Sequence, residues 1–172
     1  MDAAQREYSI QHNIYVLNKN TGEVDTSFNA AIKQAVFDTL ISEGVDIICV
    51  VNVLITDDIG IWEYNRDYRS IDKVTDVLSF PMQTFTKAGW GGCFDLEYDE
   101  DTGELPLGDI VISMERVEKQ AVEYGNKVEY ETAYLLIHST LHLLGYDHDD
   151  EVNEKVMHRK IKNIINSMSF QV

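Results

Sequence analysis

The sequence predicts an α+β fold, in which a mixed sheet of about four strands packs with about five helices. Segments with the periodicity of strands and segments with that of helices alternate along the chain. The 172 residues, of which 44% are hydrophobic, fit one compact domain with a core of its own. Since no internal repeat is visible, we expect a single domain over residues 1–172.

The N-terminal part of the chain predicts two strands and two helices. Residues 8–17 (YSIQHNIYVL) are β-rich and partly alternating, which is typical of an edge strand. From Asp25 onward apolar residues recur at helical spacing until Gly44, which closes the helix. Residues 45–55 form an apolar run typical of a strand buried on both faces. Residues 57–68, with their acidic first turn, indicate a short helix.

The C-terminal part continues this alternation. Pro81 stops a strand, and Gly145 ends the longest apolar helix. Between the middle strands, residues 85–106 are rich in glycine and acidic residues, which predicts a long loop or hairpin, either solvated or folded as a flap over a site. The expected elements are strands at 77–80 and 107–113 and helices at 114–125, 128–144 and roughly 151–168.

Composition restricts the class of protein. The net charge of −16 argues against a broad electrostatic surface for nucleic acid, so any contact with RNA must be local. The apolar run 45–55 is too short to span a membrane, and the polar N-terminus is unlike a secretory signal. Cys49, expected in a buried strand, and Cys93, expected in the loop, give no disulfide framework. We expect a soluble, cytoplasmic protein without a membrane partner.

Three of the five histidines fall within HSTLHLLGYDH, residues 138–148. His138 and His142 stand four residues apart, so on a helix both imidazoles lie on one face and can reach one ion. Gly145 ends the helix and turns the chain back, so that His148 can approach the same ion from a third direction. Three protein ligands leave one coordination position open, which is typical of a catalytic metal site.

The same histidine intervals occur in the metzincin zinc proteases, which carry a glutamate base directly after the first histidine. Here that position is Ser139, which cannot deprotonate water, so peptide hydrolysis by that route lacks its base. Asp147 and Asp149 flank the third histidine. We interpret them as hydrogen-bond partners of the imidazoles or as surface acids.

Three segments together resemble the YbeY family of metal-dependent endoribonucleases. HSTLHLLGYDH resembles the family's HGxLHLxGYDH, and NRDYRSIDKVTDVLSFP (65–81) resembles its NxxYRxxDxPTDVLSFP; LGDIVIS (107–113) is the third segment. Ser139 replaces the usual glycine and Val74 the usual proline, and neither is an expected ligand. The resemblance implies single-strand-directed RNA cleavage in ribosomal RNA maturation, at the 3′ end of the small-subunit RNA, and in ribosome quality control.

The resemblance also implies the site. His138, His142 and His148 would bind one zinc ion, or another divalent metal, in a cleft between the final helices and the sheet. Arg69 joins them as a catalytic residue, because its planar fork of donors suits phosphate oxygens.

The remaining charged residues of the central segment have two interpretations. Arg66 and Lys73 either extend a local basic strip for RNA or belong to a surface salt-bridge face with Asp67 and Asp72. We expect Asp76 and Asp109 to cap a strand or to brace a loop.

Zinc can lower the pKa of bound water to about 7 and polarise a phosphoryl oxygen. Whether water or the RNA 2′-hydroxyl attacks stays open. Ribosomal RNA and proteins of the small subunit are the expected partners, and the sequence predicts no oligomeric state. One alternative is a ribosome assembly factor with a structural metal and little catalysis. The other is a metzincin-like zinc hydrolase, which Ser139 disfavours.

Overall fold

The computed structural model describes residues 10–20, 25–92 and 95–168. It confirms an α+β domain with a four-stranded mixed sheet and five helices. The elements are β1 (Asn13–Asn18), α1 (Thr26–Ser42), β2 (Cys49–Thr56), α2 (Asp58–Arg69), β3 (Val77–Pro81), a 3-10 turn (Trp90–Gly92), β4 (Leu105–Ser113), α3 (Met114–Tyr124), α4 (Val128–Leu143) and α5 (Glu151–Ser167).

The sheet has the strand order β1-β2-β4-β3. β1, β2 and β4 are parallel, whereas β3 runs antiparallel to β4 at the edge of the sheet. Pro81 was expected to stop β3 and is its last residue, paired with Gly108. Proline is tolerated there because an edge strand leaves one side of its backbone unpaired.

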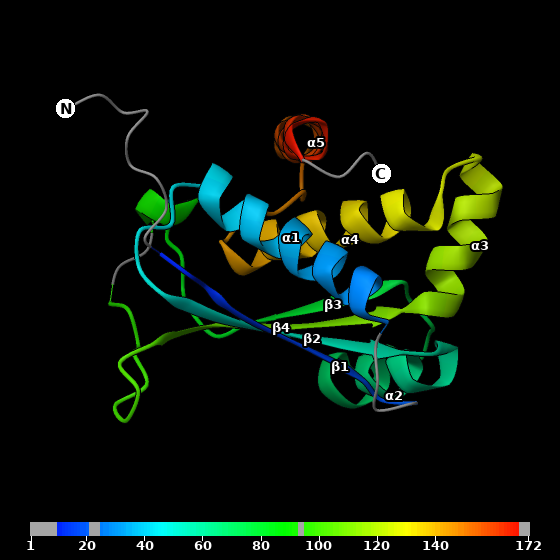
Figure 1. The fold of residues 1–172 in the computed structure, drawn as a ribbon, viewed down its shortest axis with the longest axis horizontal. Helices are drawn as coiled ribbons and strands as arrows, with labels where there is room; N and C mark the ends of the chain where they lie inside the picture. Colours follow the sequence, from blue (N-terminus) through cyan, green and yellow to red (C-terminus); the bar gives the residue numbers. More distant parts are fainter. Residues whose placement is uncertain (1–9, 21–24, 93–94, 169–172) are drawn as a thin grey trace.

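Helices cover the two faces of the sheet unequally (Figure 1). α1 and α4 lie on one face with α5 beyond them, and α2 lies alone on the opposite face. The main core lies between the sheet and α1 and α4, where Leu40, Ile110 and Leu136 are fully buried. α4 is buried around most of its circumference, as its apolar sequence requires.

The opposite face holds a much smaller apolar cluster, formed by Ile61, Leu78 and Val111. The prediction that residues 45–55 form a strand buried on both faces is therefore wrong in two respects. β2 begins only at Cys49, and its Asn52 is exposed on the face that α2 leaves partly uncovered.

Other boundaries shift by a few residues. Within the described residues β1 begins at Asn13, and residues 8 and 9 of the expected strand lie outside them. In the described part of the expected loop 85–106 the structure has a bridge residue at Phe85 and the 3-10 turn, and the last residues of this range already belong to β4. Cys49 is buried as expected, and Cys93 lies outside the described residues. In the described part of the chain, none of the helices combines the length and apolarity needed to cross a bilayer.

Candidate metal centre

Two of the three histidines are held by α4, the most buried helix. His138 and His142 are half-buried one turn apart, and the residues between them, from Ser139 to Leu141, are all buried. Because the helix is fixed by packing on most sides, the direction of the two imidazoles is fixed by the backbone.

The chain reverses directly after α4 through a glycine turn. The amide of Gly145 donates to the carbonyl of His142, and the amide of Tyr146 donates to that of Leu141, which are the two hydrogen bonds of a Schellman motif. Gly145 has a φ of +79°, and a Cβ at this position would lie 2.4 Å from the Cβ of Phe85. Glycine is thus required both by the left-handed backbone and by the lack of space.

The turn brings His148 to the other two histidines, as the spacing predicted. One nitrogen of each imidazole lies within 4.8 Å of the others, and the Nε2 atoms of His138 and His142 are 3.0 Å apart. Zinc binds imidazole at about 2.0–2.1 Å, so two tetrahedral ligand atoms stand roughly 3.4 Å apart. The donor set and its spacing therefore fit a single divalent metal ion.

A hydrogen bond fixes the tautomer of His142. Its Nδ1 lies 2.7 Å from the carbonyl oxygen of Tyr146, which can only accept, so Nδ1 carries the proton and Nε2 keeps its lone pair. The same tyrosine donates its hydroxyl to Glu43 at 2.6 Å, and Lys160 of α5 approaches the other oxygen of Glu43 at 2.7 Å. The turn that orients the ligand is thus tied to α1 and α5.

Burial keeps two of the three histidines, His138 and His142, neutral. It lowers the pKa of His138 to about 4, an effect that the neighbouring His142 and His148 increase and Asp76 opposes. Burial also lowers the pKa of His142, although its bond to the Tyr146 carbonyl acts in the opposite direction. Both rings are neutral at pH 7, which is the protonation state that a metal ligand needs.

The three imidazoles line a pocket of ≈ 530 Å³ between α4 and the edge strand β3. Arg69, at the last position of α2, lines the same pocket, and its Nη2 donates to the Ser79 carbonyl at 2.6 Å. The pocket therefore combines a possible metal with a permanent cation. Its other lining residues are Thr75, Asp76, Val77, Ser79, Pro81, Gly145, Tyr146 and Asp147.

Local backbone features place Arg69. α2 ends directly after it, because Ser70 has left-handed backbone angles with a φ of 58°. The buried Asn65 then donates from its side chain to the Lys73 carbonyl at 2.8 Å, and its own carbonyl accepts from the amide of Ile71. The asparagine that opens the 65–81 segment thus holds the chain between α2 and β3.

Arg66 and Lys73 do not form one continuous basic strip with Arg69 in the structure. Arg66 donates to Asp67 at 2.7 Å, as the salt-bridge interpretation expected. It also lies over the Trp62 ring. Lys73 lies beyond the end of α2 and so does not share a helical face with Arg66 and Arg69.

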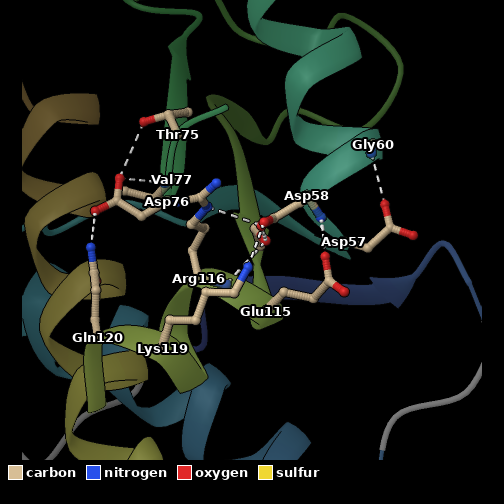
Figure 2. Close-up of polar contacts among 11 residues, drawn as sticks. Asp57, Asp58, Gly60, Thr75, Asp76, Val77, Glu115, Arg116, Lys119 and Gln120 are labelled. Carbon is tan, nitrogen blue, oxygen red and sulfur yellow. Dashed lines mark hydrogen bonds and ion pairs between the residues drawn. The ribbon is translucent and has the colours of Figure 1, made fainter. Parts of the chain in front are cut away.

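Asp76 caps the start of β3, as expected, and also lines the metal pocket, which sequence reasoning missed. Figure 2 shows its carboxylate between the amide of Val77, at 2.8 Å, and the side chain of Gln120 on α3, at 2.9 Å. Only its position inside the 65–81 segment signalled a role in the site. Asp109 instead accepts from Asn52 at 2.8 Å on the opposite face of the sheet.

Two further predictions concern residues beside the histidines. Ser139 is fully buried and its carbonyl accepts from Ser79, so its side chain points into the core rather than into the pocket. Asp147 accepts from the backbone amide of His148 at 2.7 Å, and Asp149 is exposed.

Comparisons with known proteins identify relatives of this chain. A sequence model described as "Endoribonuclease YbeY" matches residues 15–169. A protein named "Endoribonuclease YbeY" from Clostridium botulinum (strain Loch Maree / Type A3) is 42% identical over 165 residues, covering 91% of this chain and 98% of its own length. One of the same name from Clostridium kluyveri (strain NBRC 12016) is 39% identical over 161 residues, covering 90% of this chain and 93% of its own.

A solved structure is similar as well. The solution structure of a Thermotoga maritima protein has a TM-score of 0.55 and 30% sequence identity to this chain, with coverage of 88% of this chain and 85% of the other. The matches extend across nearly the whole length and include the histidine segment and the segment that carries Arg69. The chain therefore belongs to the YbeY endoribonuclease family.

Proposed function

We propose that this chain is a zinc-dependent endoribonuclease that cuts single-stranded RNA in ribosomal RNA maturation, at the 3′ end of the small-subunit RNA. The observation that carries the proposal is the meeting of three imidazoles and one arginine on the same pocket. His138, His142 and His148 would hold the metal, which when bound supplies Lewis acidity toward a phosphoryl oxygen and lowers the pKa of water.

Other residues of the pocket would bind the phosphate and stabilise the charge that develops during cleavage. The Ser79 carbonyl holds the guanidinium of Arg69 at the pocket edge, where its remaining N–H groups can bind a phosphate and stabilise charge that develops during cleavage. Asp76 and Asp147 are the carboxylates of the pocket lining, and both accept hydrogen bonds from backbone amides. Their negative charge keeps the pocket from binding the whole backbone tightly, so contact with RNA stays local.

Cleavage of a labelled single-stranded RNA tests the proposal. His142→Ala should abolish metal-dependent cleavage, and Arg69→Ala should slow it about 10²–10³-fold, since loss of one group that stabilises the transition state costs roughly that much. Arg69→Lys keeps the charge but not the fork and should recover only part of the rate. Arg159→Ala, at an exposed arginine of α5, is the matched control and should cut normally.

The same assay separates the alternatives. If metal-loaded protein cuts no faster than His142→Ala, the assembly factor with a structural metal is the better proposal. A 2′,3′-cyclic phosphate on the product would assign the attack to the RNA 2′-hydroxyl. Metal-dependent proteolysis of an unfolded protein would favour the zinc hydrolase, against which the burial of Ser139 argues.

A further inference from the structure

A second concave surface lies on the face of the sheet opposite the metal centre. This groove has a volume of ≈ 590 Å³ and is formed by the four strands on one side and α2 on the other. Three of its large apolar side chains are exposed: Tyr15 to 57%, Leu17 to 55% and Tyr68 to 71%. The complete lining is Tyr15, Val16, Leu17, Asn52, Val53, Leu54, Tyr64, Tyr68, Phe80, Asp109, Ile110 and Val111.

Strand register places four of these residues in one row across the sheet. Tyr15 pairs with Asn52, Asn52 with Asp109, and Asp109 with Phe80. The row has an aromatic ring at each end, and in its middle the Asn52 amide donates to the Asp109 carboxylate at 2.8 Å. Flat rings beside an amide and a carboxylate offer a nucleobase both a stacking surface and hydrogen-bond partners.

An aromatic wall closes one side of the groove. The rings of Tyr64 and Tyr68 are stacked, with centroids 5.8 Å apart. The rings of Tyr68 and Phe80 pack in a T-shaped arrangement, with centroids 5.7 Å apart. Among the described residues that line the groove there is no lysine or arginine. The surface therefore suits uncharged bases rather than phosphates.

Arg69 of the metal pocket also approaches the groove. Its guanidinium lies 5.6 Å from the Phe80 ring, on the groove side of β3, and donates to the carbonyl of Ser79, which lines the metal pocket. Two consecutive residues of the edge strand, Ser79 and Phe80, thus line the metal pocket and the groove respectively. A strand of RNA whose phosphate meets Arg69 would pass its neighbouring bases over this edge.

We propose that the open sheet face is a stacking platform for unpaired bases that flank the cleaved phosphodiester, with Tyr15, Tyr68 and Phe80 as the stacking rings and Asp109 accepting base N–H groups. This platform rests on the endoribonuclease function proposed above. A second copy of this chain fits the groove less well, because it would bury the Asp109 carboxylate and bring together two molecules of net charge −16.

The binding of a labelled RNA of about eight nucleotides tests the platform, since single-strand sites span roughly 4–16 nucleotides. Metal-loaded protein is titrated on ice, and a gel confirms that the RNA stays intact. Tyr15→Leu and Tyr68→Leu should each bind roughly five- to 150-fold more weakly, the range for loss of one stacked base. Tyr124→Leu removes a ring that is 61% exposed on α3, outside the groove, and should bind as the unchanged protein does.

A second RNA, in which one base is replaced by an abasic sugar, tests whether the ring contacts that base. The abasic RNA should bind the unchanged protein more weakly. The loss of affinity should be smaller for Tyr68→Leu, because the stacking partner is already absent. Equal binding by Tyr15→Leu, Tyr68→Leu and Tyr124→Leu would overturn the platform. So would sedimentation showing dimers that Tyr15→Leu dissociates, since a second copy would then occupy the groove.

Cleavage is measured separately with the same proteins. If the unchanged protein binds through the rings but cuts nothing, the platform stands and the nuclease proposal fails. If it cuts RNA while both ring variants bind normally, the nuclease proposal stands and the platform fails.

Discussion

The two faces of the sheet are stabilised by different interactions. The face beneath α1 and α4 belongs to a large apolar core, in which Leu107, Ile110 and Ile112 of β4 are fully buried. On the other face α2 shares only a small apolar cluster with β3 and β4, and Tyr15 and Leu17 stay exposed. Parallel strands usually bury both faces, so this half-open sheet departs from the ordinary arrangement.

The difference matches the two tasks that we assign to the faces. Metal ligands must be held within a fraction of an ångström, and the packed helix α4 provides this precision for His138 and His142. A groove that receives flexible RNA needs accessible rings rather than a packed core. The covered face therefore provides rigidity, and the open face provides accessible surface.

The largest expected effect is on metal binding at the covered face of the sheet. His142→Ala should lower the affinity for zinc by more than about a hundredfold, because changes even to groups behind a ligand cost 10–100-fold. Elemental analysis of purified protein measures the loss. His158→Ala, which removes a histidine of α5 that contacts the Tyr134 hydroxyl, should keep one metal per chain. Loss of metal from both variants would contradict the assignment of the site.

A pair of leucines compares the two faces directly. Leu136→Ala, in the core, should lower the free energy of unfolding by about 2–5 kcal/mol, because it removes buried methyl groups and leaves a cavity. Leu17→Ala, on the open face, should cost less than about 1 kcal/mol, since this side chain is 55% exposed. Urea denaturation measures both. Equal losses would mean that another part of the molecule covers the open face.

The turn that carries His148 can be tested with two glycines. Gly145→Ala should destabilise the protein by about 2 kcal/mol and weaken metal binding, since a side chain here combines left-handed strain with the contact to Phe85. Gly44→Ala is the matched control, because Gly44 follows α1 with a φ of +71° and a Cβ added there would have no neighbouring atom within 4 Å. Gly44→Ala should lower the free energy of unfolding through the left-handed strain alone and leave the metal affinity unchanged. A similar fall in metal affinity in both variants would argue against a specific role for the turn.

The site was more predictable from the sequence than the sheet. The pitch of a helix and the glycine turn fix the positions of His138, His142 and His148 locally, so their spacing was enough to predict the cluster. The open face depends on which helices the chain places over the sheet, and this is a long-range property. The apolar run 45–55 indicated burial on both faces, although its Asn52 is exposed on the open face.

Residues that join the site from other elements were harder to find. Arg69 followed from its segment, and the structure places it on the pocket through the left-handed Ser70 that ends α2. Glu43 and Lys160 lie far from the histidines in the sequence, yet they hold the turn through Tyr146. No local pattern marks such contacts, because they arise only when α1 and α5 pack beside the turn.

Polar contacts compensate for the small apolar cluster under α2. Figure 2 shows Asp58, at the start of this helix, facing Arg116 and Lys119 of α3. Its carboxylate receives Lys119 at 2.9 Å, the Ser113 hydroxyl at 2.8 Å and Arg116 at 3.1 Å. Its side chain is only 18% exposed, so these charge-assisted bonds are partly shielded from solvent.

The smallest expected effect tests this polar anchor through its pH dependence. Burial of Asp58 acts to raise its pKa, but the bonds from Lys119 and Ser113 and the charge of Arg116 outweigh burial and lower the pKa below its usual 3.8. The stabilisation is therefore present above that pH and lost as the pH falls through the folded-state pKa. Asp58→Asn should cost about 1–2 kcal/mol at pH 7 and progressively less in acid.

Urea denaturation at a series of pH values, compared with Asp67→Asn, measures this dependence. Asp67 also pairs with an arginine, but in solvent on the surface of α2, so its replacement should change stability little at any pH. A cost for Asp58→Asn that stays constant from pH 7 into acid would mean that the carboxylate charge contributes nothing. α2 would then be held on the open face mainly by apolar contacts around Ile61, Leu78 and Val111, and the two faces would differ chiefly in the amount of apolar surface they bury.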